Sequence, residues 1–526
     1  MTEPPRPASL RHATSGMVCS VDHLASGAGI GAMRAGGSAA DAAVAASAVL
    51  AVTTQHMCGL GGDLFALVHD PATSATACLN ASGRAGSGAD PDRLRSEGHA
   101  SMPFKGDVRS VTVPGCVDGW LELHGRFGRL PLADVLLPAI QLAAGGFPAS
   151  PLLAASAPRI ADVDGADEFR TDPPLRTGDL VRRPGVARSL AAIVADGRTG
   201  FYGGEFGTGL IELGAGEFTP DDLATSQADW VAPLSAEVWG HTVHTVPPSS
   251  QGYLSLAGAL IAVGLDLPDD DDDPRWAHLL IESARQAAWD RPGVLHEGAD
   301  GNALVEPGRL AARRRAIDTD AAAELPDTYR GGGTIYLCAV DADRMGVSLI
   351  QSNASGFGAH LVVPGTGIHL HNRGTGFSLR PGHPAEYGPR RRPPHTLSPA
   401  LVTHPDGRLR SVLGTMGGDA QPQVVLQLLT RLLRDGDDAG RCISAPRWIL
   451  TSPHATGFDT WTTTDGPIVS VEPHAPTGWD DGLRQRGHTV RRAADNYGLA
   501  HLIEVVGPVL AGASDPRART GAAAGY

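Results

Sequence analysis

The sequence changes character after Arg330. Three glycines, residues 331–333, stand directly before residues 334–341 (TIYLCAVD) and 346–352 (GVSLIQS), two apolar and β-branched runs joined by a short turn. Such a pair predicts a β-hairpin. A helix is predicted over residues 421–434, and the earlier part of the chain mixes strand and helix patterns. Because these patterns do not alternate in a regular βαβ rhythm, we expect an α+β fold built of layers.

The sequence predicts one helix from its N-terminal capping residues and from its small side chains. Residues 42–52 (AAVAASAVLAV) are small and apolar, and Ser38 and Asp41 fit a capping box ahead of them. This pattern predicts a helix that packs closely through its alanines. The preceding residues 27–32 match G-x-G-x-x-A, the dinucleotide fingerprint. They lie in a small-residue helical pattern instead of a strand-to-helix turn, so we expect no nucleotide site there.

The composition is that of an ordinary globular protein. The 526 residues are 42% hydrophobic and carry a formal net charge of −14. Nucleic-acid binding needs a basic stripe, and the sequence offers only short arginine clusters such as residues 390–392. No apolar run reaches the roughly 18 residues of a membrane span, and residues 1–16 lack the apolar core of a signal peptide. We therefore expect a cytoplasmic protein without a nucleic-acid or membrane partner.

The sequence lacks the common metal and cofactor motifs. Its six cysteines form no C-x-x-C pair, which argues against a zinc ribbon or a redox motif. The five aspartates at residues 269–273 lack the spacing and the glycine of a calcium loop and are interpreted as a solvated loop. Neither a G-x-S-x-G elbow nor an H-E-x-x-H motif is present. We expect no cofactor and no metal.

Thr334 occupies the first position of the predicted hairpin. If the bond between Gly333 and Thr334 were cut, Thr334 would become a chain terminus. Its α-amine, with an ordinary pKa of about 8, could then serve as base for its own hydroxyl, so that nucleophile and base lie in one residue. The alternative is a strand that simply begins after a glycine turn.

The sequence resembles the γ-glutamyltranspeptidase family of N-terminal-nucleophile hydrolases over nearly the whole chain. The stretches that carry the resemblance, in family order and at family spacing, are GMVCSVDHLASGAGIGAMRAGGSAADAAVA, GLGGDLFALV, VPPSSQG, GTIYLCAVD, FGAHLVVPGTGI, RRPPHTLSPAL, LGTMGGDAQPQ and GASDPR. It is most similar to a short intracellular branch that includes glutathione-hydrolase-like proteins and oxamate amidohydrolases.

The resemblance implies a proenzyme that cleaves itself between Gly333 and Thr334. The products would be a large subunit, residues 1–333, and a small subunit, residues 334–526, with Thr334 as the N-terminal nucleophile. The two subunits would stay together as one four-layer αββα sandwich, the N-terminal-nucleophile hydrolase fold. The family's second hydroxyl, which orients the amine of the nucleophile, falls on Ser352.

The same register assigns further residues and shows departures from the family pattern. The paired glycines whose N–H groups form the oxyanion hole fall on Gly417 and Gly418. In true γ-glutamyltranspeptidases an asparagine and an acidic residue hold the α-ammonium of glutamate, but here Ala354 and Gly376 stand in their places. Arg373 stands where an amide or an acid is expected. A buried ammonium without an acceptor is costly, so we predict little demand for an α-amine.

The residues that bind the substrate's carboxylate in the family are also replaced in this sequence. Two serines that hold it in the family correspond to His395 and Thr396. The family's carboxylate-binding arginine lies two residues before the position of Arg84, which is a candidate for that role in a shifted register. We therefore predict that Arg84, Arg373, His395 and Thr396 bind an acyl group that bears a carboxylate.

The function predicted from these residues is hydrolysis of γ-glutamyl or related carboxylate-bearing acyl amides through a threonine acyl-enzyme. The loop between residues 377 and 392 is short, which suggests an open pocket in which water competes well with an amine acceptor. One alternative is an amidase or C–C hydrolase for a short oxalyl-type acid such as oxamate. Another is an inactive binding homologue. The oligomeric state stays open, with a homo-oligomer among the options.

Overall fold

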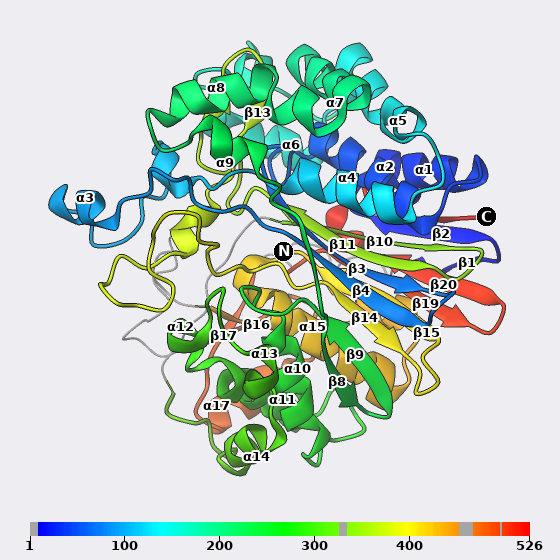
Figure 1. Cartoon of the computed structure of the whole chain (residues 1–526). Helices are drawn as coiled ribbons and strands as arrows, with labels where there is room; N and C mark the ends of the chain where they lie inside the picture. Colours follow the sequence, from blue (N-terminus) through cyan, green and yellow to red (C-terminus); the bar gives the residue numbers. More distant parts are fainter. Residues whose placement is uncertain (1–8, 326–333, 452–466, 495–496) are drawn as a thin grey trace.

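The computed structural model describes residues 9–325, 334–451, 467–494 and 497–526. Within these ranges, two seven-stranded sheets lie face to face, and helices cover the outer face of each sheet (Figure 1). The structure therefore confirms the α+β class and the four-layer αββα sandwich. Gly333 and the two glycines before it lie outside the described residues.

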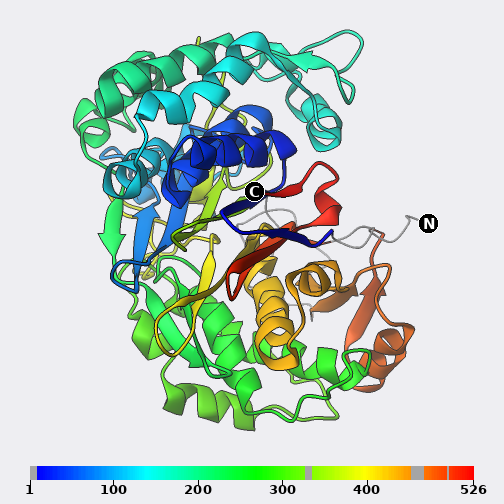
Figure 2. The same cartoon turned by 90° about the vertical axis from the view of Figure 1, so that its right-hand side faces the viewer.

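Both large sheets are antiparallel throughout. The first contains, in spatial order, β1 (Arg11–Ala13), β20 (Val509–Ser514), β19 (Ala500–Val506), β15 (Leu409–Thr415), β14 (Ala400–Thr403), β9 (His241–Thr245) and β8 (Leu234–Val238). The second contains β21 (Ala522–Gly525), β2 (Gly16–Ser20), β10 (Ile335–Asp341), β11 (Gly346–Ser352), β3 (Asp63–Asp70), β4 (Ala75–Ala81) and β7 (Asp229–Val231). Because β1 pairs with β20 and β2 with β21, the first strands of the described chain lie beside the last ones (Figure 2).

Each outer layer has helices on the sheet and further helices outside them. On the second sheet lie α1 (His23–Arg34), α2 (Ala39–Thr53) and α4 (Cys116–Phe127), with α5 (Leu132–Gly145) and α7 (Pro184–Tyr202) packed on them. On the first sheet lie α10 (Tyr253–Val263), α15 (Gln421–Leu429) and α16 (Ala439–Ser444), with α11 (Pro274–Ala288), α14 (Pro307–Arg315) and α17 (Thr477–Gln485) outside.

Shorter elements complete the described structure. They are α3 (Pro91–Ser96), α6 (Pro151–Ser156), α8 (Glu205–Gly214), α9 (Pro220–Ala224), α12 (Arg291–Val294), α13 (Gly301–Leu304), β5 (Phe147–Pro148), β6 (Leu180–Val181), β12 (Val362–Val363), β13 (Ile368–His369), β16 (Trp448–Thr451), β17 (Ile468–Val471) and β18 (Thr489–Arg492).

Strand β10 is buried on both faces, which explains its unbroken apolar sequence. Ile335 and Leu337 pack in the core beneath the helices of the second sheet. Tyr336 and Cys338 point the other way, into the core between the two sheets. The predicted hairpin is confirmed, because β10 pairs antiparallel with β11.

The small-residue helix is confirmed as α2, and every one of its side chains is buried. Ser38 and Asp41 form the predicted capping box. The Ala39 N–H also donates to Asp341 Oδ2 at 2.9 Å, so the end of β10 helps to cap the start of α2. Residues 27–32, the dinucleotide lookalike, lie inside helix α1 as expected.

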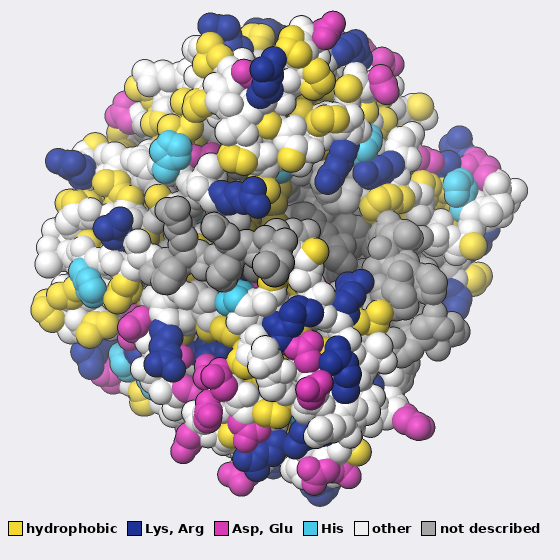
Figure 3. Space-filling view, turned by 180° about the vertical axis from the view of Figure 1, so that it is seen from behind, with side chains coloured by type: hydrophobic (Ala, Val, Ile, Leu, Met, Phe, Trp, Pro, Cys, Tyr) yellow, Lys and Arg dark blue, Asp and Glu magenta, His cyan; other side chains and the backbone are white. Residues whose placement is uncertain are grey.

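The structure agrees with the predicted helix after residue 421 and with the predicted aspartate loop, with a small difference in how the helix ends. The helix predicted over residues 421–434 is α-helical to Leu429 and then continues as a π-helical turn, Thr430–Asp435. The aspartates at residues 269–273 form a largely exposed loop. Basic and acidic side chains of the described residues are interspersed on the face drawn in Figure 3. Among the residues described, the structure has no helix with the length and apolar character needed to cross a bilayer.

The packing between the sheets predicts the effect of adding one methyl group. A Cβ on Gly414 in β15 would lie 2.4 Å from the ring of Tyr336, which is fully buried and tethered through its hydroxyl to Ser348 Oγ at 2.9 Å. We expect Gly414→Ala to lower stability by about 1–3 kcal/mol, measured as a lower thermal midpoint. Gly27→Ala, at an open position on α1, is the control and should leave the midpoint unchanged or raise it slightly. Equal midpoints for the two variants would contradict this view of the packing.

Candidate active site

Thr334 and Ser352 meet at the open end of the β10–β11 hairpin. Ile335 pairs with Gln351 in the antiparallel register, so the next residue on each strand comes opposite the other. Thr334 Oγ1 lies 3.2 Å from Ser352 Oγ, and both residues are fully buried. The hairpin thus places the two hydroxyl residues singled out from the sequence within hydrogen-bond distance.

Arg373 joins this pair to Thr396. It opens a short 3-10 turn, Arg373–Gly376. Its Nη2 donates to Ser352 Oγ at 3.3 Å, and its Nη1 donates to Thr396 Oγ1 at 3.0 Å. The side chain is buried, and this burial lowers the pKa of Arg373 to about 10, although the carboxylates of Asp63 and Asp419 act in the opposite direction. A buried cation therefore lies next to the two hydroxyls.

Asp63 supplies negative charge to the same cluster. This first residue of β3 has Oδ2 at 2.9 Å from His395 Nε2, 3.2 Å from His371 Nδ1 and 3.9 Å from Arg373 Nε. Its Oδ1 accepts a hydrogen bond from the Gly83 N–H at 3.0 Å. Burial alone would raise the pKa of Asp63, but the two histidines hold it well below its usual range. Asp63 is therefore a carboxylate around which three side chains gather.

His395 is neutral and has a defined tautomer. Its Nδ1 accepts from the Leu397 N–H at 3.2 Å, so its proton is on Nε2 and is donated to Asp63. Burial, followed by the charge of Arg373, lowers the pKa of His395 to about 3. An uncharged imidazole in this place orients the Asp63 carboxylate toward Arg373.

Gly417 and Gly418 are linked to the cluster through Gln251. The Gln251 side-chain amide donates to Thr396 O at 2.8 Å and to Gly418 O at 2.9 Å. The glycines have φ of 135° and 56°, and the first value is one that side-chain-bearing residues avoid. Gly418 begins a 3-10 turn, where backbone N–H groups have no acceptor within the turn. The buried Arg291 donates to the neighbouring Asp419 at 2.6 Å.

In the described part of the chain, the remaining candidates contribute no polar side chain to this cluster. Arg84 Nη2 donates to Asp229 Oδ2 at 2.8 Å, and within the described ranges no bond joins Arg84 to the cluster. The Ala354 N–H donates to Ser352 Oγ at 2.8 Å. A Cβ on Gly376 would lie 2.5 Å from the carbonyl oxygen of Pro394, so an acidic side chain has no room there.

Sequence reasoning missed Asp63, His371 and Gln251. Asp63 had one local signal, a charged residue at the start of an apolar strand directly after GLGG. Gln251 lies in VPPSSQG, a stretch that carried the family resemblance without a residue role. His371 had no signal, because its contact with Asp63 joins segments far apart in the chain.

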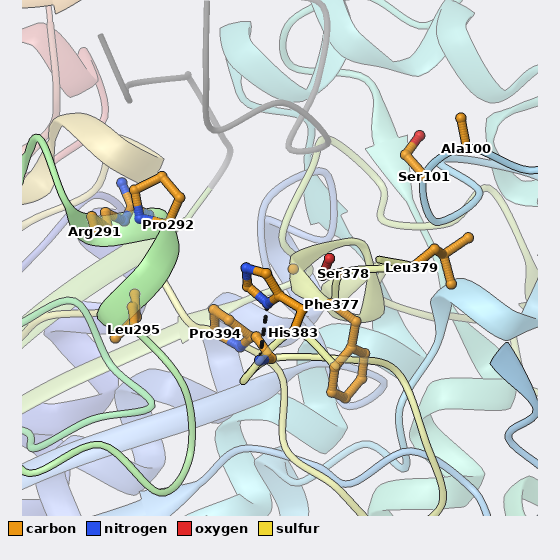
Figure 4. Close-up of a pocket in the computed structure, with 12 residues that line it drawn as sticks. Ala100, Ser101, Arg291, Pro292, Leu295, Phe377, Ser378, Leu379, His383 and Pro394 are labelled. Atoms are coloured by element: carbon orange, nitrogen blue, oxygen red, sulfur yellow. Dashed lines mark hydrogen bonds between the residues drawn. The ribbon is translucent and has the colours of Figure 1, made fainter. Parts of the chain in front are cut away.

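A cavity of about 120 Å³, whose lining is drawn in Figure 4, adjoins the segments that carry Arg373 and His395, because Gly376 and Pro394 line it. It is lined by Ala100, Ser101, Arg291, Pro292, Leu295, Gly376, Phe377, Ser378, Leu379, His383, Ala385 and Pro394. Arg291 connects it to Asp419, next to Gly418, and Pro394 precedes His395. The lining combines apolar side chains with Arg291, His383 and two serines, which suits a small molecule that carries both apolar and polar groups.

Two groups of described residues have the spacing to hold a metal ion, and neither belongs to this cluster. One is His278, Glu282 and His488, all buried; the other is the exposed loop residues 270–272. Among the described residues, the cluster around Thr334 offers hydroxyls, a guanidinium, a carboxylate and two imidazoles.

Comparison with known proteins gives the family of the chain. Residues 25–526 match the family described as Gamma-glutamyltranspeptidase. The chain is 35% identical to the glutathione hydrolase-like YwrD proenzyme of Bacillus subtilis (strain 168), over 94% of this chain and 92% of that protein. It is 34% identical to the oxamate amidohydrolase proenzyme of Klebsiella pneumoniae, over 98% of this chain and 99% of that protein.

A solved structure extends the similarity to three dimensions. The cephalosporin acylase from Bacillus halodurans superimposes with a TM-score of 0.90 at 31% identity, covering 100% of this chain and 98% of that one. Since the family match runs over nearly the entire sequence, this protein belongs to the γ-glutamyltranspeptidase family of hydrolases and acyltransferases.

Proposed function

We propose that the chain is a proenzyme that cleaves itself before Thr334 and then hydrolyses amides of short acyl groups bearing a carboxylate. The observation that carries this proposal is the buried Thr334 hydroxyl, which directly precedes a rigid strand and lies 3.2 Å from Ser352 Oγ. Two relatives are named proenzymes. After cleavage, residues 1–333 and 334–526 would stay joined by the pairing of β10 with β2 and of β11 with β3.

In the proposed reaction, Thr334 Oγ1 attacks the amide carbonyl while the α-amine of Thr334 accepts the hydroxyl proton. The N–H groups of Gly417 and Gly418 stabilise the negative oxygen of the tetrahedral intermediate, each contributing roughly 3 kcal/mol. The amine returns the proton to the leaving nitrogen, the C–N bond breaks, and an ester remains on Thr334. Water then attacks the ester with help from the same amine, which releases the acid and restores the hydroxyl.

The charge of the cluster supports a substrate that bears a carboxylate. Burial disfavours the charged form of Arg373, and the carboxylates of Asp63 and Asp419 offset only part of that effect on its pKa. A substrate carboxylate near the guanidinium would lower the remaining cost. Gly376 offers no acid and Ala354 no amide to an α-ammonium, so a donor without the amine should be accepted at least as well.

An oxalyl-type amide is the second candidate substrate. It is favoured by the 34% identity to an oxamate amidohydrolase proenzyme over 98% of this chain. In oxamate the carboxylate is attached directly to the reacting carbonyl, so it would be recognised close to Thr334. In both candidates the same nucleophile and the same oxyanion donors act.

Thr334→Ala should remain a single polypeptide and should show no amidase activity, because cleavage and catalysis share one hydroxyl. Intact mass spectrometry of the wild type should show two chains, of residues 1–333 and 334–526. Thr334→Ser is the matched control, since it keeps a hydroxyl and should still be cut. If the alanine variant is still cut at residue 333, Thr334 is not the group that performs cleavage.

Turnover of paired substrates should reveal the weak demand for an amine. Glutaryl-p-nitroanilide and γ-glutamyl-p-nitroanilide differ only in the α-ammonium, and we expect kcat/KM for the glutaryl compound to be equal or higher. Oxamate, followed by ammonia release, tests the second candidate. Arg373→Gln should raise KM for whichever donor is preferred. A strong preference for the γ-glutamyl compound would contradict the proposed pocket, and failure with all three would refute the amidase assignment.

Asp63→Asn should destabilise the protein by about 3–5 kcal/mol at neutral pH, because it removes the buried negative charge that faces His371, His395 and Arg373. The folded-state pKa of Asp63 lies below its unfolded value, so its stabilisation is present above about pH 4 and is lost as the pH falls further. The gap in thermal midpoint between wild type and variant should therefore be constant from pH 7 to 5 and narrow below about 4. Asp92→Asn, at a mostly exposed carboxylate, is the control and should show little gap. A gap for Asp63→Asn that does not change with pH would contradict the ionised state assigned to Asp63.

A further inference from the structure

Three ligand-type side chains converge in the helical layer on the first sheet, outside the Thr334 cluster. His278 and Glu282 lie one turn apart on the same face of α11, and His488 follows the end of α17. All three are buried, and their ligand atoms lie within 4.8 Å of one another. His488 Nε2 is 2.8 Å from His278 Nδ1 and 3.9 Å from Glu282 Oε1.

The surroundings of His278 resemble the environment of a metal ligand. Its Nε2 lies 2.9 Å from the carbonyl oxygen of Asp318 and donates its proton there. This leaves the lone pair of Nδ1 directed toward His488. Histidines that ligate metals usually donate their other ring N–H to a carbonyl or a carboxylate in this way, which fixes the tautomer and the ring orientation.

His488 is held in place by the way α17 ends. The Gly487 N–H donates to Arg484 O and the His488 N–H to Leu483 O, at 2.9 and 3.1 Å. With Gly487 at φ 88°, these two bonds form a Schellman cap. The backbone of His488 is therefore fixed by its own helix and not only by the contact with His278.

Glu282 is positioned by two further contacts. Its Oε2 accepts from the Ala323 N–H at 3.1 Å, and its Oε1 accepts from Arg285 Nη1 at 2.6 Å. Arg285 also donates to Ala323 O at 2.7 Å. Oε1 keeps a second lone pair. It can therefore accept the hydrogen bond from Arg285 and also bind a cation that lies toward His488.

We propose that His278, Glu282 and His488 bind a zinc ion. Zinc accepts two imidazoles and one carboxylate and completes a tetrahedron with water. Zn–N bonds of about 2.0 Å place two ligand nitrogens roughly 3.3 Å apart, so the two rings need to separate by only about half an ångström.

The zinc ion would join parts of the chain that lie on opposite sides of residue 334. His278 and Glu282 precede Thr334, whereas His488 follows it. If the chain is cut before Thr334, the ion would connect the two polypeptides through their helices. The zinc site itself does not rest on that cleavage, and a site that forms in the uncut Thr334→Ala variant distinguishes the two ideas.

The test is zinc stoichiometry and affinity in the full chain without an affinity tag. Protein stripped with a chelator and returned to one equivalent of ZnCl₂ should retain one ion per chain by mass spectrometry of the metal after gel filtration. His488→Gln keeps a donor toward His278 Nδ1 but lacks the imidazole ligand. It should weaken zinc binding by more than the roughly 10–100-fold that loss of an outer-shell partner costs, measured by calorimetry.

Two further variants make the result decisive. Glu282→Gln should also weaken binding, whereas His23→Gln, at a mostly exposed histidine, should leave stoichiometry and affinity unchanged. Wild-type protein that retains no zinc, or equal affinity in wild type and His488→Gln, would overturn the proposal. Cobalt bound in place of zinc should give the visible absorption of a tetrahedral site in the wild type and lose it in His488→Gln.

Discussion

Burial of strand β10 on both faces decides where the polar chemistry of this molecule can lie. A polar group inside the strand would have to find partners within two apolar cores, so polar groups gather at its ends. At one end Asp341 accepts from the N–H groups of Ala39 and Met345. At the other end Thr334 meets Ser352. The nucleophile proposed here thus sits on backbone that two sheets hold rigidly, as preorganised catalysis requires.

The site is built from charges that compensate one another away from water. Arg373 lies near Asp63, and Arg291 bonds Asp419 next to the proposed oxyanion glycines. Interactions between such charges are stronger at low effective dielectric than at the surface. The same environment makes each charge expensive without its partner. A substrate carboxylate near Arg373 would stabilise the charged form of a guanidinium whose pKa is lowered by burial, and this favours the proposed carboxylate over an ammonium.

The features that could be predicted from the sequence are those that depend on local patterns. The capping box of α2 and the β10–β11 hairpin each depend on residues close together in the chain, and both were predicted at the right place. Ser352 was assigned from the family resemblance, and the hairpin register in the structure places it opposite Thr334. The Asp63 contacts could not be foreseen, because His371 and His395 come from segments more than 300 residues further along the chain. Gln251 was missed for the same reason, since its role lies in bonds to Thr396 and Gly418.

The departures from the family pattern differ in how firmly the backbone fixes them. Ala354 has a φ of 70°, a conformation that asparagine adopts more readily than alanine, so the backbone would still accept the family's amide. Gly376 is different, because any side chain there would collide with the carbonyl oxygen of Pro394. Restoring the acidic partner of an α-ammonium would require the backbone around Pro394 to move, and His395 with its bond to Asp63 follows directly after. The proposed weak demand for an amine is therefore tied to the same segment that orients the buried carboxylate, because a side chain at Gly376 would displace the backbone next to His395.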